Sequence, residues 1–399
     1  MPCIVGIDLY ELDLPFRQAF RHAAAERVRS ESLLVRFVTD RGHVGYGEAL
    51  PRPYVTGETR GGAFDLLAQL ILPRILGTGF TSFEEVREFL VACDGKVPPV
   101  WVDAGTAQTA AWCAVDLALL DTFGRAFGIS LGRGLPGGQG AGAWPEDLRY
   151  SLVVSDDPGR RRLMTLLKAR LYGIRDVKLK VSGQSPAGVH LARRVLGARA
   201  RLRVDSNMAW SYGGARRAMA LVGHDGVEAF EQPLPADDLD GMAHLTADGQ
   251  AVIADESVHD AASLERLIAA RACTGVNIRI AKCGGLVASL ARCRRALEAG
   301  LTLQIGCQVG ETSQLSAAQL ALVRTLGPGA SYLEGCYGER LLAVDPVRPL
   351  LQFGRGGRPP AALRGPGFGT AIDLRAVELY AGRRISLGTA MTAHAEGMR

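Results

Sequence analysis

The chain has 399 residues, of which 47% are hydrophobic and 22% are charged, with 46 basic and 41 acidic side chains. This composition excludes a disordered chain, and the length predicts two or three domains around a substantial core. The net charge of +5 is small and no run of five or more Lys and Arg residues occurs, so we expect no nucleic-acid partner.

The sequence also predicts neither a membrane-spanning helix nor a membrane partner, because no stretch of about eighteen apolar residues occurs. The N-terminal residues MPCIVGIDLYELDLPF carry acidic side chains early and lack the basic start and apolar core of a signal peptide. The eight cysteines form no CxxC pair, which is typical of free thiols in a reducing compartment. These features predict a cytoplasmic α/β protein.

The first part of the chain mixes strands and helices. A β-branched run over residues 32–39 is followed by a turn and a returning strand, which predicts a hairpin. Helical apolar spacing then covers residues 61–76, 82–93 and 106–127. The sequence PGGQG, which begins at Pro136, breaks the helical pattern, so we place a domain boundary after residue 138.

From residue 139 onward, short strands alternate with helices. The predicted strands are 150–154, 176–180, 201–205, 229–232, 251–255, 275–280, 302–305 and 331–334. Eight strands separated by helices predict a β/α barrel over residues 139–345. The doubly wound alternative requires a GxGxxG motif after a strand, and the sequence has none there. A Gly- and Pro-rich loop and a strand-like tail then predict that residues 346–399 return to the N-terminal region 1–138.

Three acidic residues lie at the ends of consecutive predicted strands. Asp205, Glu231 and Asp255 are spaced by 26 and 24 residues, about one β/α unit each. Any one of them alone reads more simply as a strand-end cap. Three carboxylates converging at the barrel mouth repel one another unless a cation joins them, and oxygen ligands suit Mg²⁺, with Mn²⁺ as the alternative.

Two lysines precede these acids on one strand. Lys178 and Lys180 are two residues apart, so both point to the same side of the strand. We expect a paired, partly desolvated ammonium to lose proton affinity and become a general base. The alternative of an exposed edge strand fits poorly with a barrel strand. A metal ion and a neutral amine together suit removal of a proton alpha to a carboxylate, with the resulting enediolate stabilised by the metal.

These residues and their surroundings resemble the enolase superfamily, and within it the muconate-cycloisomerase-like subgroup (mandelate racemase/muconate lactonizing enzyme). The barrel motifs are VKLKVSG, VDSNMAW, EQPL, ADESV and AKCGGL, and the upstream motifs are GYGEALPRPYVTGET and LGRGLPGG. The resemblance extends from about residue 4 to residue 380. It implies a modified (β/α)7β barrel of the TIM type under an α+β capping domain, with a small-molecule carboxylate substrate held between them. It also favours a homo-oligomer.

The resemblance implies a role for each residue of the site. The metal ligands would be Asp205, Glu231 and Asp255, with Lys180 as the acid/base on one face and Lys178 as its electrostatic neighbour. Supporting positions around the ligands would be Asn207, Glu256 and Lys282.

The chain departs from the subgroup at three places that concern the reaction or the substrate. Arg279 stands where a second lysine is usual, and a guanidinium stays protonated at neutral pH, which disfavours two-base racemisation. Glu311 matches a family glutamate only loosely, and we assign it a hydrogen-bonding or proton-relay role. The sequence after Glu334 lacks the Asp-x-Asp pair with which dipeptide epimerases of the subgroup hold an ammonium group.

Substrate contacts are expected from two capping loops, near residues 14–21 and 46–59, and from two barrel strand ends. The candidates are Phe16, Arg17, Tyr54, Thr56, Gln308 and Glu334. For the four loop residues, ordinary loop packing is an equally good interpretation.

Three readings of the function stay open. The first is a Mg²⁺-dependent one-base cycloisomerase or lyase that uses Lys180. The second is a racemase or epimerase of an amino-acid derivative or dipeptide. The third is a relative that binds metal and carboxylate without turnover, which Arg279 alone favours.

Overall fold

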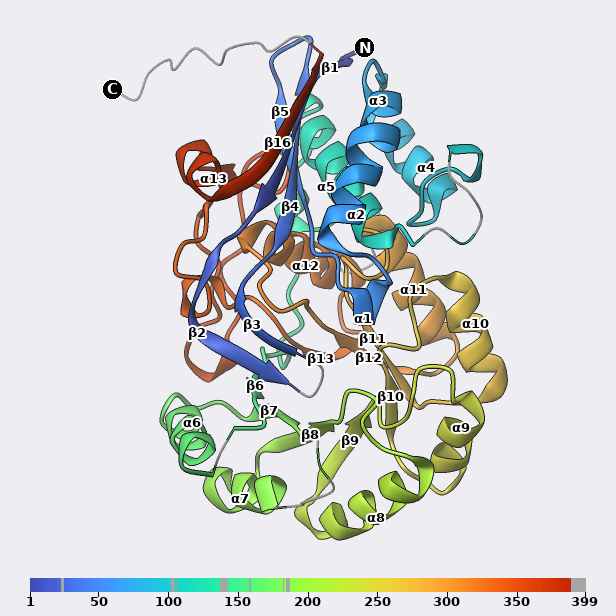
Figure 1. The fold of residues 1–399 in the computed structure, drawn as a ribbon, viewed down its shortest axis with the longest axis vertical. Coiled ribbons are helices and arrows are strands. Elements are labelled where there is room, and N and C mark those ends of the chain that lie inside the picture. Colours follow the sequence, from blue (N-terminus) through green and yellow to red (C-terminus); the bar gives the residue numbers. More distant parts are fainter. Residues whose placement is uncertain are drawn as a thin grey trace.

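The barrel sheet comes from the central part of the chain. The computed structural model describes residues 1–22, 25–101, 105, 107–136, 143–157, 159–181, 183 and 187–388. Eight strands pair in parallel, in the order β13-β12-β11-β10-β9-β8-β7-β6 (Figure 1). Their bounds are β6 Leu152–Val154, β7 Asp176–Lys180, β8 Arg201–Asp205, β9 Val227–Glu231, β10 Val252–Ala254, β11 Gly275–Ile278, β12 Thr302–Ile305 and β13 Ala330–Leu333.

Each strand but the last is followed by a helix of the barrel. These helices are α6 Gly159–Leu171, α7 Ala187–Leu196, α8 Tyr212–Val222, α9 Leu239–Ala247, α10 Ala261–Ala270, α11 Leu286–Glu298 and α12 Ser313–Leu326. A backbone bond from Ser151 N to the Leu333 oxygen, 2.7 Å long, brings the last strand beside the first. The predicted (β/α)7β architecture is therefore confirmed, with all eight strands near their expected positions.

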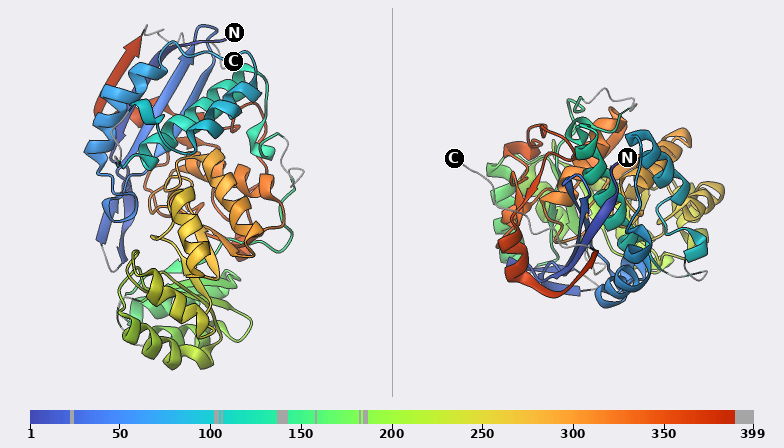
Figure 2. Two further views of the ribbon diagram at one scale, coloured as in Figure 1. Left: turned by 90° about the vertical axis from the view of Figure 1, so that its right-hand side faces the viewer. Right: turned by 90° about the horizontal axis from the view of Figure 1, so that it is seen from above.

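A second, antiparallel sheet lies above the barrel. Its order is β16-β1-β4-β5, from β1 (Ile4–Leu12), β4 (Ser32–Thr39), β5 (Val44–Ala49) and the C-terminal β16 (Ala381–Gly388). The helices that accompany this sheet are α2 Arg60–Leu66, α3 Leu72–Ile75, α4 Phe83–Cys93 and α5 Thr109–Ala126. Figure 2 shows the sheet and these helices together at one end of the molecule. The expected return of the C-terminal segment to the N-terminal region is confirmed by the pairing of β16 with β1.

The domain boundaries at residues 138 and 345 stay predictions, and residues 137–142 lie outside the described part of the chain. No helix among the described residues is both long enough and apolar enough to cross a membrane.

Buried acids connect the two bodies. The Glu48 carboxylate accepts bonds from Thr312 N and from the Thr312 hydroxyl at the start of α12. Asp116 on α5 accepts a 2.7 Å bond from Leu286 N at the start of α11. Carboxylates at helix N-termini satisfy free N–H groups and complement the helix dipole, so these contacts fix the upper body on the barrel.

A hairpin replaces the first predicted capping loop. Residues Pro15–His22 (β2) and Ala25–Arg29 (β3) pair antiparallel, and Figure 1 shows the hairpin descending toward α6. Its base is fixed to loops beyond the barrel strands: Arg17 N donates to the Leu341 oxygen and the Ser30 hydroxyl donates to the Gly310 oxygen. The second predicted loop is also largely regular, since it contains the end of β5 and the short helix α1 (Pro53–Thr56).

Close contact between β5 and α5 requires a glycine at position 47. A Cβ atom there would lie 1.9 Å from the Ala114 oxygen and 2.5 Å from Ala118 N, both backbone atoms that cannot rotate away. We expect Gly47→Ala to lower the free energy of unfolding by about 3 kcal/mol, measured by urea denaturation. Gly159→Ala is the control, because a Cβ there meets nothing within 4 Å. Equal unfolding midpoints for the two variants would contradict this packing argument.

Candidate active site

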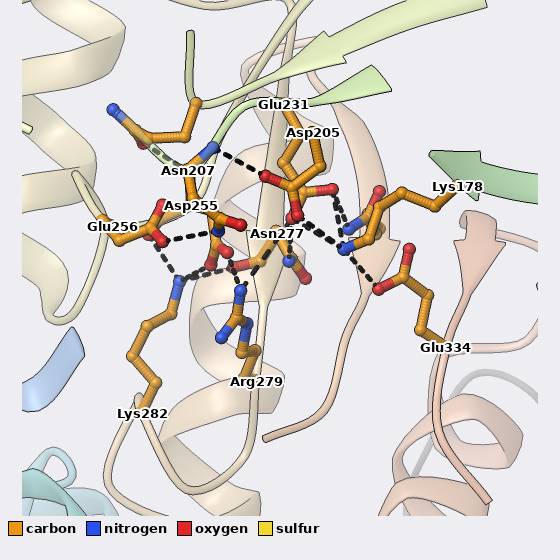
Figure 3. Close-up of polar contacts among 12 residues, drawn as sticks. Lys178, Asp205, Asn207, Glu231, Asp255, Glu256, Asn277, Arg279, Lys282 and Glu334 are labelled. Carbon is orange, nitrogen blue, oxygen red and sulfur yellow. Dashed lines mark hydrogen bonds and ion pairs between the residues drawn. The ribbon is translucent and has the colours of Figure 1, made fainter. Parts of the chain in front are cut away.

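The three predicted metal ligands lie at the carboxyl ends of adjacent strands (Figure 3). Asp205 and Glu231 are the last residues of β8 and β9, and Asp255 directly follows β10. Asp205 is paired in register with Glu231 on one side and with Lys180 on the other. All three carboxylates are at most 1% exposed, so the strand register brings buried acids to one edge of the barrel.

The three carboxylates lie close enough to one another that neighbouring pairs share a single cationic side chain. Lys178 Nζ lies 3.3 Å from Asp205 Oδ2 and 3.0 Å from Glu231 Oε1. The Arg279 guanidinium bonds Asp255 and lies 3.9 Å from Glu231 Oε1. Asp205 and Glu231 therefore meet at one ammonium, and Glu231 and Asp255 meet at one guanidinium.

The donor set fits a hard divalent cation. Asp205, Glu231 and Asp255 supply carboxylate oxygens, and Oε2 of the neighbouring Glu256 is buried and has no hydrogen-bond partner in the described part of the chain. Among the described residues, however, no three acidic, His or Cys side chains stand in the close arrangement of a formed metal centre. Each of the three carboxylates instead contacts a Lys or Arg side chain. The metal assignment therefore stays a prediction supported by the chemistry of the donors.

Lys178 differs from the sequence-based expectation. Its ammonium contacts Glu231, Asp205 and Glu334, the last at 2.6 Å. Burial alone would lower the pKa of Lys178, but the three carboxylates outweigh burial and raise the pKa. The expected loss of proton affinity is thus wrong for Lys178, because acids and not a second ammonium dominate its surroundings. Lys178 is a fixed positive charge.

Lys180 has fewer contacts than its neighbour. Its Nζ lies 3.0 Å from Asp205 Oδ2 and 2.6 Å from Asn207 Oδ1. Lys178, Lys180 and Lys282 are three of only five lysines in a chain with 41 arginines. An arginine stays protonated and cannot serve as a base, so the amine of Lys180 can perform a role that a guanidinium at the same position could not.

Arg279 and Lys282 both contact Asp255. Lys282 Nζ donates to Asp255 Oδ1, to the Asp255 oxygen and to the Asn277 oxygen. Burial lowers the pKa of Lys282 to about 7, but all three of its donors are used inside the protein. Arg279 donates 3.0 Å to Gln308 Oε1 and faces the site. At the position where the subgroup usually carries its second lysine, this chain therefore carries the guanidinium of Arg279.

Several barrel residues that position the acids were not identified from the sequence. Asn277 Nδ2 and Gln304 Nε2 each donate a 2.9 Å bond to Glu231. Gln232 accepts bonds from Asp255 N and Ser257 N and thereby joins the tips of β9 and β10. They could have been found in the sequence as polar residues at positions of the predicted strands that point into the barrel.

Two of the residues predicted to support the ligands, Asn207 and Glu256, contact each other, and Asn207 also contacts Asp205. Asn207 N donates to Asp205 Oδ1, and Asn207 Nδ2 donates 3.1 Å to Glu256 Oε1. Asn207 has a φ of 45°, in the left-handed region, which turns its side chain toward Lys180. Burial raises the pKa of Glu256 to about 7.

Most predicted substrate-binding residues contact other parts of the protein. Glu334 binds Lys178 and, at 3.0 Å, Arg203, so it serves the charge network instead of facing a substrate. Arg17 Nε donates 2.5 Å to the Glu339 oxygen, and the Thr56 hydroxyl bonds within the loop at Arg52.

The two aromatic candidates have protein neighbours as well. Phe16 packs against Gly310 and forms a β-bridge with Leu342, while the Tyr54 ring lies 5.7 Å from the Arg27 guanidinium. For all four loop residues these contacts favour ordinary loop packing over substrate binding.

Gln308 and Glu311 instead line a cavity of about 710 Å³ beside the acidic cluster. Gln308 connects the cavity to Arg279, and its Nε2 has no hydrogen-bond partner among the residues that the structure describes. Glu311 Oε1 accepts a 2.6 Å bond from Gln308 N. Burial raises the pKa of Glu311 to about 8, with nearby Glu48 adding to the effect, so this carboxyl is protonated at neutral pH.

Comparison with known proteins identifies the family. The enolase C-terminal domain-like model matches residues 162–377, more than half of the chain, and the chain belongs to this family. It is 28% identical over 331 residues to the L-Ala-D/L-Glu epimerase of Clostridium acetobutylicum, covering 81% of this chain and 87% of that protein. It is 27% identical over 320 residues to the N-succinyl-L-Arg/Lys racemase of Bacillus cereus, covering 79% and 82%.

Solved structures establish the same fold. The crystal structure of the B. cereus racemase has a TM-score of 0.83 at 23% identity, over 96% of this chain and 100% of that one. The 2-chloromuconate cycloisomerase of Rhodococcus opacus 1CP has a TM-score of 0.83 at 24% identity, over 95% and 100%. The resemblance to the mandelate racemase/muconate lactonizing enzyme subgroup of the enolase superfamily is confirmed, and the chain is an enzyme of the isomerase or lyase class.

A further neighbouring structure contains a metal ion and a dipeptide. The dipeptide epimerase of Enterococcus faecalis V583 is complexed with Mg and L-Leu-L-Tyr, with a TM-score of 0.77 at 23% identity over 93% of this chain and 100% of that one.

Proposed function

We propose that the protein removes and returns the proton alpha to the carboxylate of an amino-acid derivative, with Lys180 as the base. One observation carries this proposal: the Lys180 amine lies at the barrel mouth in register with the buried acids Asp205 and Glu231. The relatives at 27–29% identity are named as epimerases and racemases of amino-acid derivatives, which supports this substrate class.

Asp205, Glu231 and Asp255 would hold a Mg²⁺ ion. When bound, the ion would neutralise negative charge that develops on the substrate carboxylate as the α-proton leaves. Although burial alone would raise the pKa of Glu231, Lys178 and Arg279 lower it, so the carboxylate is ionised and ready to bind a cation. Lys178 balances the charge of Asp205 and Glu231.

Epimerisation is the reading that the relatives favour, and it replaces one-base chemistry as our first choice. Inversion requires a proton donor on the face opposite Lys180, and Arg279 is a poor acid. Glu311 is protonated at neutral pH, lines the cavity and is joined to Arg279 through Gln308. We assign the second-face proton to Glu311.

Replacing Glu311 by glutamine tests this assignment. We expect Glu311→Gln to retain Lys180-dependent exchange of the α-proton but to lose inversion by about 10²–10⁴-fold, since the amide cannot donate a proton as an acid. Exchange is measured by proton NMR in D2O and inversion by polarimetry, on one N-acyl amino acid. Glu339→Gln is the control, because Glu339 is a partly exposed acid in the nearby loop after β13.

The pH dependence gives a second readout. The Glu311 carboxyl is protonated below its pKa of about 8 and loses the proton above it, so inversion should fall relative to exchange as the pH rises through 8. The ratio of the two rates should not change with pH in Glu311→Gln. Normal inversion by this variant would remove Glu311 from the mechanism.

One-base cycloisomerase or lyase chemistry is the second candidate, and Arg279 is the observation that favours it. In that case deuterium enters from one face only, no inversion accompanies exchange, and Glu311→Gln leaves product formation unchanged.

A further inference from the structure

We propose that Glu48 of the upper body is a positioning residue for Glu311: it fixes the loop that carries Glu311 and keeps the second-face proton on that side chain. This inference rests on the proposed function, because it concerns how the second proton donor is controlled. Glu48 is fully buried and bonds the start of α12, so it acts on the reaction through its neighbour and not by contact with the substrate.

Glu48 holds the residue that directly follows Glu311. Thr312 N donates to Glu48 Oε1 at 3.1 Å, and the Thr312 hydroxyl donates to Glu48 Oε2 at 2.6 Å. Leu315 N adds a 3.3 Å bond to the same Oε2 atom. These donors belong to the first turn of α12, where backbone N–H groups have no partner within the helix. Glu48 therefore fixes where α12 begins, and with it the backbone next to Glu311.

Two other side chains from the N-terminal part of the chain hold the residues that precede Glu311. Arg52 Nη2 donates to the Val309 oxygen at 3.0 Å and to the Ser30 oxygen at 2.7 Å. The Ser30 hydroxyl in turn donates to the Gly310 oxygen at 2.6 Å. Both flanks of Glu311 are thus bonded to segments that come before the barrel in the chain, so these segments set the position of its carboxyl group.

The two acids differ in how well a negative charge on them is stabilised. Burial raises the pKa of both Glu48 and Glu311. Glu48 accepts the three bonds from Thr312 and Leu315, whereas Glu311 accepts one among the described residues, from Gln308 N. Two buried acids that repel each other lose their protons in separate steps, and the one with more donors ionises first. The first charge therefore resides on Glu48, and this charge raises the pKa of Glu311.

Other groups around Glu311 act against Glu48 or carry no charge. The guanidinium groups of Arg279, after β11, and Arg52, before α1, lower the pKa of Glu311. Three neutral groups also lie near it, each with a pKa raised by burial: Cys113 on α5, Cys307 in the same loop and Tyr150 before β6. Glu48 opposes the two cations, so the upper body contributes both the charge that retains the proton and one of the charges that would release it.

Carboxyl titrations followed by NMR test this order of ionisation without any turnover. The protein is labelled with glutamate enriched in ¹³C at the side-chain carboxyl carbon, with Mg²⁺ present throughout. The two signals are assigned by their loss in Glu48→Gln and in Glu311→Gln. We expect Glu48→Gln to lower the pKa of Glu311 by about one pH unit, because a neighbouring negative charge is removed. Glu311→Gln should leave the pKa of Glu48 unchanged, because Glu311 is neutral while Glu48 ionises.

Further variants separate charge from structural support. Glu48→Asp keeps the charge, so it should leave the pKa of Glu311 near its wild-type value, and it also identifies the Glu48 signal. Arg52→Met removes a cation and should raise the pKa of Glu311, which is the opposite direction to Glu48→Gln. Asp116→Asn is the matched control: Asp116 also joins the upper body to the barrel, through Leu286 N, but it does not bond the loop of Glu311. This control should leave the pKa of Glu311 unchanged.

The reaction gives a second readout. In Glu48→Gln, the fall of inversion relative to α-proton exchange should occur about one pH unit lower than in the wild type, and Asp116→Asn should keep the wild-type profile. An unchanged pKa of Glu311 in Glu48→Gln would overturn the proposal. If Glu48→Gln does not fold, Glu311→Gln decides: a lowered pKa of Glu48 in that variant would show that Glu311 ionises first. Failure of the proposed function is separate, because it would appear as normal inversion by Glu311→Gln while the titrations behave as expected.

Discussion

Replacing Lys180 by methionine is expected to lower the rate of α-proton exchange by at least about 10³-fold. Lys180 ends β7 in register with Asp205, and among the described residues its amine bonds Asp205 and Asn207. A positioned base contributes about 10²–10⁴-fold, and methionine retains the length of the side chain without any basic atom. The rate is followed as deuterium incorporation in D2O with Mg²⁺, using pooled N-acyl amino acids and dipeptides.

A control lysine separates this effect from a loss of folding. Lys96 forms a partly exposed ion pair with Asp260, so Lys96→Met should cost little and keep the full exchange rate. Lys180→Arg should be as inactive as Lys180→Met, because a guanidinium does not accept a proton at neutral pH. Exchange that persists in folded Lys180→Met would show that another group is the base.

Replacing Glu231 by glutamine is expected to weaken binding of a divalent cation by at least about 10²-fold. Glu231 is fully buried and lies between Asp205 and Asp255 along the strand ends, so its charge is central to the carboxylate set. Even residues that only support a metal ligand change affinity 10- to 100-fold, and loss of a ligand charge should do at least as much. Binding of Mn²⁺ followed by electron paramagnetic resonance measures this effect independently of activity.

Two further variants make the Glu231 result interpretable. Glu228→Gln changes an acid on the same strand that binds Arg201 and the Tyr332 hydroxyl, and it should leave metal binding unchanged. Glu231→Asp keeps the charge that Lys178 requires, yet moves it away from the other ligands. Wild-type affinity for Mn²⁺ in folded Glu231→Gln would contradict the assignment of this ligand.

The barrel was largely predictable from the sequence because its strands are buried on both sides. β7 is buried at every position, and such strands appear as β-branched runs between helical windows. The hairpin β2–β3 was missed, since Arg17 and Gln18 interrupt any regular pattern of apolar residues there. Its conformation depends on bonds to distant segments, such as that from Ser30 to the Gly310 oxygen.

The acidic residues of the site were also predictable, because the ends of parallel strands meet at one edge of a barrel. The charge state of Lys178 was not, since it depends on Glu334, which lies 156 residues away in the sequence. The cavity of about 710 Å³ was equally hidden. It forms where α6, the hairpin and the loops after β12 and β13 meet. No local sequence motif predicts that these distant segments come together.

The most direct test of the account is the stereochemistry of exchange catalysed by the wild-type enzyme. Single enantiomers of N-acyl amino acids, including those with terminal carboxylates, are incubated in D2O with Mg²⁺ and analysed by proton NMR and chiral chromatography. We predict that deuterium enters the α position and that the inverted enantiomer accumulates. Absence of exchange with all N-acyl amino acids and dipeptides, by enzyme that binds Mn²⁺ normally, would contradict the account.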